Sequence, residues 1–284
     1  MNIRKLLNYG IGVLRNVSIF SYPNVIGNKI LKTKRRIYFR DGTSVSEISL
    51  PLLANFCNRG KIVDSKYQIY EWNVNGQKYY ANYEQANSLL SEYVVGEFDQ
   101  IYGDEIRGKR ILDIGGFIGD TARYYLDNGA EYVDIYEPIE ANMAAMKKNL
   151  EDYSISKYKI NTKGVSKDEG VLEIYTDSEP GRSDFGTSTK PGEKKYSIQC
   201  TSFDRVLEEN NYDIAKVDCE GCEIGLANLD DKMLRRIKTW IIETHNEEID
   251  KQVVETFNRC GFEHAEMKKV NDGVRIIKFS LNKG

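Results

Sequence analysis

The stretch KRILDIGGFIGDTARYYLDNGAEYVDIYEP, residues 109–138, carries the clearest fold signal in the chain. It opens with a short apolar run that ends in Asp113, and a helical pattern begins near Asp120. Three glycines lie between these two points: Gly115, Gly116 and Gly119. Glycine lets a backbone turn sharply and lets a ligand approach closely, because it has no Cβ atom. The stretch therefore predicts a buried strand, a glycine-rich turn and a helix, with a ligand at the turn.

A regular alternation of strands and helices extends from this stretch to the end of the chain. Strands are predicted over residues 110–114, 131–137, 157–164, 213–219, 238–244 and 273–281. Helices are predicted over residues 119–128, 139–152, 202–209 and 247–260. This alternation is typical of βαβ units, in which helices cover both faces of a largely parallel sheet. We therefore predict an α/β domain over residues 106–284, interrupted by a long loop at 178–196 that is rich in Gly, Pro, Ser and Thr.

Residues 1–105 follow a different pattern and are predicted to form an N-terminal helix and hairpin extension. One helix fits residues 2–18, and another fits residues near 83–101. Asp41-Gly42 and Asn75-Gly76 each lie between β-rich runs, which is a strong signal for a hairpin turn. We expect the extension to act as a substrate lid or as an interaction region.

The charge of the chain limits the classes of partner. The 40 Lys and Arg residues and 43 Asp and Glu residues give a formal net charge of -3, so no overall basic field favours nucleic acid. The first forty residues nevertheless carry only basic charges: Arg4, Lys5, Arg15, Lys29, Lys32, Lys34, Arg35, Arg36 and Arg40. We interpret them as a solvated face, with peripheral contact to a membrane or another anionic surface as the alternative.

The cysteines and the apolar runs bear on localisation. The five cysteines show no disulfide-scaffold spacing, which predicts free thiols in a reducing compartment. They are Cys57, Cys200, Cys219, Cys222 and Cys260. No apolar run is long enough for a membrane-spanning helix, and no small-residue cleavage site follows the first apolar run. These features predict a cytoplasmic protein.

An acidic residue ends the second predicted strand. Open α/β sheets bind ligands at the carboxyl ends of their strands. A carboxylate at that position can accept hydrogen bonds from both ribose hydroxyls of a nucleoside. Glu137, which is followed by Pro138, is therefore predicted to bind the ribose of a cofactor.

The glycine turn discriminates between two nucleoside cofactors. The dinucleotide fingerprint G-x-G-x-x-G would require glycine where Ile114 stands, and Asp120 at the helix start would repel a pyrophosphate. The observed D-x-G-G-x-x-G, from Asp113 to Gly119, instead resembles the first motif of class I S-adenosylmethionine (SAM)-dependent methyltransferases.

Three further segments sharpen this resemblance: TSFDRVL at 201–207, YDIAKVDCEGCE at 212–223 and KTWIIETHN at 238–246. With them, the chain resembles the FkbM-family methyltransferases over roughly residues 108–268. That family shows a helix start containing Leu-Asp, a strand end Lys-x-Asp-x-Glu-Gly-x-Glu and a strand ending in Glu-x-His. The matching residues here are Phe203-Asp204, Lys216 to Glu223, and Glu243 to His245.

The resemblance implies a Rossmann-like class I methyltransferase fold, with a mostly parallel seven-stranded sheet and helices on both faces. It implies SAM as the methyl donor and a hydroxyl of a small molecule, sugar or glycan as the acceptor. We expect the cofactor to contact Asp113, Gly115, Gly116, Phe117, Gly119, Asp120, Glu137, Pro138, Val165, Ser166 and Asp218.

Two pairs of polar residues are candidates for the chemistry. Asp218 and Glu220 point to one side of their strand, and so do Glu243 and His245, because side chains alternate along a strand. If the two strands are neighbours, these groups converge beside the methyl donor. Methyl transfer needs in-line alignment, and a hydroxyl acceptor must lose its proton to a base. We predict that His245 or Asp218 takes this proton, with Glu220 as the third catalytic residue.

Other roles for this cluster and for the whole chain stay open. Asp218, Glu220 and His245 would also suit Mg²⁺ or another divalent cation that holds two substrate oxygens. Single carboxylates would alternatively pair with Lys216 or cap a helix. For the whole chain, the alternatives are an RNA-modifying methyltransferase, which would bind phosphates through its basic first forty residues, and a non-catalytic nucleoside-binding module.

Overall fold

The computed structural model describes residues 37–38, 44–45, 60–74, 77–82, 85–86, 97–103, 106–176, 194–271 and 273–281. The chain divides into two compact units, Met1–Val94 and Val95–Gly284. The predicted helix at 2–18, the basic segment before Ile37 and the Asp41-Gly42 turn lie outside the described residues. No helix within the described part of the chain is long and apolar enough to cross a membrane.

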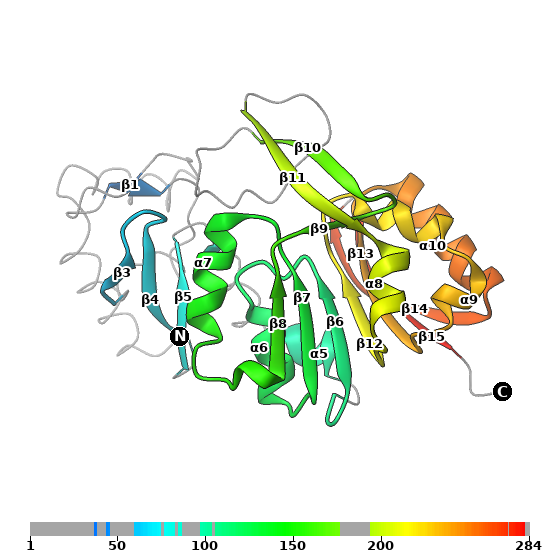
Figure 1. Cartoon of the computed structure of the whole chain (residues 1–284), viewed down its shortest axis with the longest axis horizontal. Coiled ribbons are helices and arrows are strands. Elements are labelled where there is room, and N and C mark those ends of the chain that lie inside the picture. The colour runs from blue at the N-terminus through cyan, green and yellow to red at the C-terminus, as the bar shows by residue number, and fades with distance from the viewer. Residues whose placement is uncertain are drawn as a thin grey trace, which may run out of the picture. The chain divides into compact units, whose positions relative to one another are not determined.

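The second unit is built on a seven-stranded sheet with the order β14-β15-β13-β12-β6-β7-β8 (Figure 1). The strands are β6 (Arg110–Ile114), β7 (Tyr132–Tyr136), β8 (Tyr158–Asn161), β12 (Ile214–Val217), β13 (Thr239–Thr244), β14 (Phe262–Asn271) and β15 (Val274–Leu281). Five neighbouring strands of this sheet run parallel: β13, β12, β6, β7 and β8. Strand β15 runs antiparallel to both β13 and β14. This sheet confirms the predicted mostly parallel, seven-stranded α/β fold.

Side chains of the central strands alternate between two apolar layers. On β13, Trp240 and Ile242 join the main core cluster, which also contains Phe257. Ile241, between them in sequence, packs instead with Ile101 on the opposite face. This two-residue period is expected for a sheet that is covered on both faces.

Helices flank both faces of the sheet. They are α5 (Glu97–Tyr102), α6 (Asp120–Asp127), α7 (Glu140–Asn149), α8 (Phe203–Glu209), α9 (Asp231–Leu234) and α10 (Glu247–Arg259), with short 3-10 helices η2 (Ile155–Lys157) and η3 (Cys222–Asn228). In Figure 1, α6 and α7 lie beside β6–β8, whereas α8 to α10 lie beside β12–β15. The four predicted helices correspond to α6, α7, α8 and α10.

Helix α10 illustrates how the sequence sets these elements. Asn246 caps its N-terminus by accepting a hydrogen bond from the Ile249 backbone N–H at 2.8 Å. Val253 and Phe257, four residues apart, are fully buried on one side of the helix. The ring of Phe257 packs 5.6 Å from that of Trp240 on β13. The capping residue and the apolar stripe therefore fix both where the helix begins and which face meets the sheet.

A second, three-stranded sheet corrects part of the sequence prediction. Its strands are β9 (Gly164–Ser166), β10 (Gly170–Thr176) and β11 (Lys194–Ser202), in the order β10-β11-β9. The predicted single strand at 157–164 is thus divided between β8 and β9. The predicted loop at 178–196 is too long at its end, because residues 194–196 pair with β10. Residues 177–193 lie outside the described part.

The first unit contains a three-stranded antiparallel sheet of β3 (Ile62–Asp64), β4 (Ile69–Val74) and β5 (Gln77–Ala81). Val74 pairs with Gln77, which confirms the hairpin predicted around Asn75-Gly76. A shorter antiparallel pair, β1 (Ile37–Tyr38) with β2 (Ser44–Val45), fits the other predicted hairpin. The Trp72 indole is buried and donates a hydrogen bond to the Ala81 carbonyl at 2.8 Å.

Candidate active site

The glycine loop is attached to the end of the neighbouring strand. The backbone N–H groups of Gly115 and Gly116 both donate to the Tyr136 carbonyl, at 2.9 and 3.1 Å. Gly115 and Gly119 have φ angles of +78°, and Phe117 between them has a φ of +45°. Such left-handed conformations favour glycine, because a Cβ atom is strained there. The loop therefore needs glycine for its turn, as the sequence predicts.

Packing within the protein also requires these glycines. A Cβ atom on Gly115 would lie 1.6 Å from the Asp218 carbonyl oxygen, and one on Gly116 would lie 2.2 Å from Ile135 Cγ2. A Cβ atom on Gly119 would lie 2.7 Å from Met146 Cγ. The spaces that these glycines leave open are filled by protein atoms, so they bring β6, β7, β12 and α7 close together.

Glu137 holds the loop from the side of β7. Its Oε2 atom accepts a hydrogen bond from the Phe117 backbone N–H at 2.9 Å, and its Oε1 atom accepts one from Ile139 at 2.8 Å. The carboxylate is almost completely buried, and this burial raises its pKa to about 7 despite the two backbone donors. The Asn142 side chain also hydrogen-bonds to this carboxylate, so one of its roughly four acceptor positions remains for a ligand donor.

A buried charge network connects the glycine loop to β12. The Lys216 ammonium donates a hydrogen bond to the Gly115 carbonyl oxygen at 2.6 Å. It also lies 3.4 Å from Asp113 Oδ1 and 3.5 Å from Asp218 Oδ2. Burial disfavours the ammonium charge, but Asp113 and Asp218 outweigh that effect and raise the pKa of Lys216. Lys216 is therefore a cation that orders the carboxylates around it.

The two acidic residues of the first motif are both buried. Asp113 accepts a hydrogen bond from the Thr121 hydroxyl at 2.8 Å, which joins the end of β6 to the first turn of α6. Burial raises the pKa of Asp113, although Lys216 opposes the change. Burial likewise raises the pKa of Asp120, at the start of α6, to about 6.

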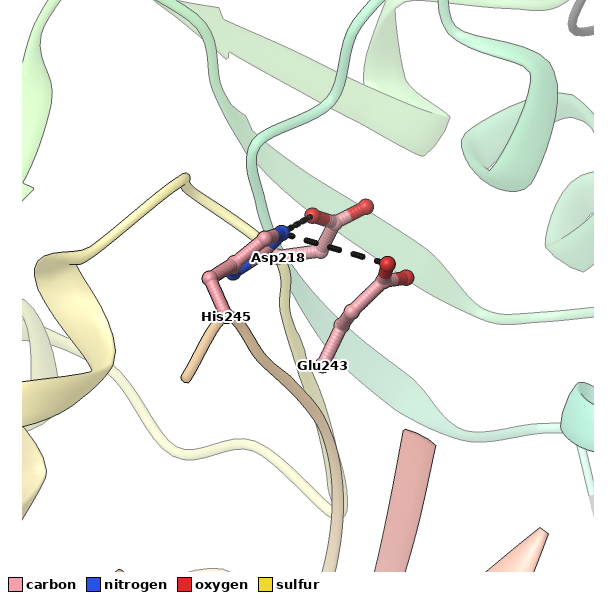
Figure 2. A group of neighbouring side chains, drawn as sticks. All are labelled: Asp218, Glu243 and His245. Atoms are coloured by element: carbon pink, nitrogen blue, oxygen red, sulfur yellow. Dashed lines mark ion pairs between the residues drawn. The ribbon is translucent and has the colours of Figure 1, made fainter. Parts of the chain in front are cut away.

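The strand ends of β12 and β13 bring the predicted catalytic residues together. The Asp218 backbone N–H donates to the Ile114 carbonyl at 3.0 Å, which extends the β12–β6 pairing by one residue. Asp218, Glu243 and His245 converge in Figure 2, as the alternation along the two strands predicts. His245 Nε2 lies 3.7 Å from Asp218 Oδ1, 3.9 Å from Glu243 Oε1 and 3.5 Å from Glu220 Oε2.

The other nitrogen of His245 faces a fourth carboxylate. His245 Nδ1 lies 3.2 Å from Glu223 Oε1, a contact whose geometry falls short of a hydrogen bond. Burial alone would lower the pKa of His245, but Glu223, Glu220 and Asp218 raise it to about 9. The imidazole is therefore predominantly protonated at neutral pH when the site holds no ligand.

The sequence prediction that all cysteines are free thiols is wrong for one pair. Cys219 and Cys222 form a disulfide bond, whereas Cys200 and Cys260 are free; Cys57 lies outside the described residues. Between the bonded cysteines, Glu220 has a φ of +58° and Gly221 one of +122°. The turn lies between the two bonded residues, and Cys219 Sγ also lies 3.4 Å from Oε1 of Glu223, the carboxylate that faces His245.

The remaining predicted cofactor residues lie in different surroundings. Pro138 is half-buried between Glu137 and the start of α7. Val165 and Ser166 lie on β9, outside the large sheet. Val165 is buried in the main core cluster, and the Ser166 hydroxyl donates to the Asp168 carbonyl at 2.6 Å. The hydrogen bonds and ion pairs described above between the glycine loop, Glu137 and the strand ends of β12 and β13 involve none of these three residues.

Comparison with known families agrees with this geometry. The family description "Methyltransferase FkbM domain" matches residues 113–264, which is more than half of the chain and spans both the glycine loop and the strand ends of β12 and β13. The chain belongs to the FkbM methyltransferase family. It is therefore a SAM-dependent methyltransferase, and the predicted family and cofactor class are confirmed.

Solved structures similar to this FkbM methyltransferase have low sequence identity. Precorrin-6y C5,15-methyltransferase from Geobacter metallireducens has 11% identity and a TM-score of 0.42, covering 67% of this chain and 88% of that one. Ribosomal protein L11 methylase from Lactobacillus delbrueckii subsp. bulgaricus has 9% identity and a TM-score of 0.41, with coverages of 66% and 77%.

A third similar structure, Streptococcus pneumoniae Sp1610, was solved in complex with S-adenosyl-L-methionine. It has 11% identity and a TM-score of 0.40, with coverages of 66% of this chain and 73% of that one. Among curated proteins, no match to this chain is found.

Proposed function

We propose that this FkbM methyltransferase transfers a methyl group from SAM to a hydroxyl of a small molecule, sugar or glycan. The observation that supports this proposal is a partly exposed cluster beside the glycine loop, formed by Asp218, Glu220, Glu243 and His245. Bases are needed when the acceptor is a hydroxyl, because its proton must leave as the new O–C bond forms. A group of carboxylates beside the methyl donor meets that need.

The cofactor site in this proposal runs from the glycine loop to Glu137. The remaining acceptor position of Glu137 binds a ribose hydroxyl, and the backbone around Gly115 and Gly116 lies against the methionine part of SAM. Because SAM carries no pyrophosphate, Asp120 at the start of α6 causes no repulsion of the kind that a dinucleotide would meet. The sulfonium methyl then faces the strand ends of β12 and β13.

The electrostatics of the cluster favour a carboxylate over His245 as the proton acceptor. With a pKa of about 9, His245 already carries a proton at neutral pH. Asp218 is held between two cations, Lys216 on Oδ2 and His245 on Oδ1, and its side chain is 34% exposed. We therefore assign the proton to Asp218 or Glu220, and give His245 the role of fixing their positions.

An Asp218→Asn variant tests this assignment against a panel of hydroxyl compounds and sugars supplied with radiolabelled SAM. We expect methyl transfer to fall by about 10²-fold to 10⁴-fold, the usual effect of losing a general base. SAM affinity should change little, because the isosteric amide retains the packing beside Gly115. Asp152→Asn, which changes an exposed carboxylate away from the site, is the matched control.

Two results would contradict the proposal. Loss of SAM binding in Asp218→Asn would show that Asp218 serves the cofactor rather than the acceptor. Methylation of RNA instead of hydroxyl compounds, together with RNA binding that weakens steeply as salt rises, would favour the RNA-modifying alternative.

A further inference from the structure

We infer that Asp218, Glu243 and His245 form a site for one divalent first-row metal cation, and that this cation binds the acceptor oxygen. This inference rests on the proposed hydroxyl methylation. It differs from the ligand set expected from the sequence, because Glu243 takes the place of Glu220.

The three side chains already have the arrangement of a metal site. They come from the ends of two adjacent parallel strands, and one ligand atom from each lies within 4.8 Å of the others (Figure 2). His245 Nε2 is 3.7 Å from Asp218 Oδ1 and 3.9 Å from Glu243 Oε1. Ligand atoms about 2.0–2.2 Å from one ion lie roughly 3–4 Å apart. The two distances from His245 are already in this range, and the two carboxylates, whose ligand atoms lie within 4.8 Å of each other, would draw together on binding.

A second observation supports the same conclusion: the Glu223 carboxylate faces the outer nitrogen of the imidazole. Glu223 is fully buried, and its Oε1 atom lies 3.2 Å from His245 Nδ1. Its Oε2 atom is buried and has no hydrogen-bond partner within the described part of the chain. A carboxylate on the outer nitrogen of a histidine is the arrangement that fixes metal-binding imidazoles, because it leaves the other nitrogen to face the ion.

The charge balance of the cluster also favours a cation. Four carboxylates, those of Asp218, Glu220, Glu223 and Glu243, lie within 3.9 Å of the single His245 ring. Lys216, another cation beside the cluster in the described part of the chain, contacts the far oxygen of Asp218 and hydrogen-bonds to the Gly115 carbonyl. A divalent ion between Asp218, Glu243 and His245 would offset the repulsion that remains.

The donor set narrows the choice of metal. Imidazole nitrogen suits Fe²⁺ and Zn²⁺, and carboxylate oxygen suits Mn²⁺, so one imidazole with two carboxylates fits these first-row ions better than Ca²⁺, which takes six to eight oxygen ligands. The three side chains are each partly exposed, at 34%, 21% and 14% for Asp218, Glu243 and His245. Three protein ligands and an open side leave coordination positions for water or for the acceptor.

Binding to such a cation lowers the pKa of the acceptor hydroxyl. The O–H bond then breaks, and its proton passes to the carboxylate of Glu220, which is not one of the three ligands. The acceptor oxygen forms a bond to the methyl carbon as the S–CH₃ bond breaks. The electron pair of that bond stays on sulfur, which leaves neutral S-adenosylhomocysteine and the methyl ether.

The test is a titration of the full chain, stripped with a chelator, with Mn²⁺ followed by electron paramagnetic resonance of the free ion. We expect one Mn²⁺ per chain with micromolar affinity. Glu243→Gln should weaken binding by at least about tenfold, the smaller end of the effect of altering a metal-site carboxylate. Glu247→Gln, at an exposed carboxylate of α10, should bind Mn²⁺ like the wild type.

Calorimetric titration with SAM on the same samples separates this inference from the proposed function. Absence of stoichiometric Mn²⁺ binding in protein that is folded and binds SAM would overturn the metal site while leaving the methyltransferase assignment intact. Equal Mn²⁺ affinity in wild type, Glu243→Gln and a second ligand variant, His245→Gln, would also overturn it. Thermal unfolding of each variant verifies that lost binding does not reflect lost folding.

Discussion

Lys216 Nζ lies 2.6 Å from the carbonyl oxygen of Gly115 and donates a hydrogen bond to it. One buried side chain of β12 thereby holds the glycine loop that follows β6. The same ammonium contacts the carboxylates of Asp113 and Asp218. The glycine loop and the proposed catalytic cluster therefore share one buried cation.

Replacing this cation should destabilise the whole second unit. In Lys216→Met, the fully buried Asp113 carboxylate loses its cation, so we expect the free energy of unfolding to fall by about 3–5 kcal/mol. Urea denaturation measures the change. Lys251→Met, which removes an exposed lysine 3.9 Å from Glu255, should cost less than about 1 kcal/mol. Equal losses in the two variants would mean that the buried contacts of Lys216 add no more to the free energy of unfolding than an exposed ion pair does.

The contact between Gly115 and Asp218 yields a matched pair of variants. Gly115 and Gly108 have nearly equal φ angles, +78° and +72°, but a Cβ atom at Gly108 meets nothing within 4 Å. Gly108→Ala should therefore cost only the left-handed backbone penalty, about 1–2 kcal/mol. Gly115→Ala should cost more and should also lower methyl transfer, because the new Cβ atom displaces the backbone at Asp218. Unfolding curves and activity are compared side by side, and equal costs would argue against the close approach.

The disulfide between Cys219 and Cys222 closes a short loop around Glu220. In the loop-entropy account, a loop of this length contributes about 2 kcal/mol to stability. A Cys219→Ser, Cys222→Ser double variant should therefore unfold at lower urea concentration than the wild type, and the reduced wild type should resemble it. Cys200→Ser, at a free buried cysteine, is the control. A wild type that is insensitive to reductant would contradict this expectation.

The polar residues at the strand ends were predictable from the sequence, because each is marked by its position at the end of an apolar run. Glu137 and His245 each follow an apolar strand, Asp113 lies near the end of another, and parallel strands place their carboxyl ends along one edge. Glu243 could also be placed from the sequence, because side chains alternate along a strand and Glu243 and His245 are two residues apart. Its place among the candidate metal ligands depends on distances between strands, which the sequence does not contain.

Other features depend on contacts that no local pattern reports. The Cys219–Cys222 bond forms because Glu220 and Gly221 adopt positive φ angles, and glutamate gives no signal for such a turn. Val165 lies in the core because β9 pairs with β11, a strand more than thirty residues away whose first three residues were interpreted as loop. The raised pKa of His245 arises from carboxylates on two separate segments. Each of these features is a product of tertiary packing.

The buried carboxylate of Glu137 predicts a pH dependence of SAM binding. Burial raises its pKa from 4.5 to about 7, so the group loses its charge as the pH falls through 7. A protonated carboxyl accepts ribose hydrogen bonds poorly, and SAM affinity should therefore be roughly tenfold weaker at pH 6 than at pH 8. Calorimetry at several pH values measures this change. Glu137→Gln should bind more weakly and should lose the same dependence; a wild-type affinity that stays constant over this range would refute the role of ionised Glu137.

The most direct measurement is calorimetric titration of the purified chain with SAM and S-adenosylhomocysteine, beside Glu137→Ala and the exposed-site control Glu208→Ala. We expect micromolar binding of both nucleosides to the wild type and to Glu208→Ala, and strongly weakened binding to Glu137→Ala. Thermal unfolding establishes that every sample is folded. Failure of the folded wild type to bind either nucleoside, or equal binding by Glu137→Ala, would contradict a SAM site built from the Gly115 loop and Glu137.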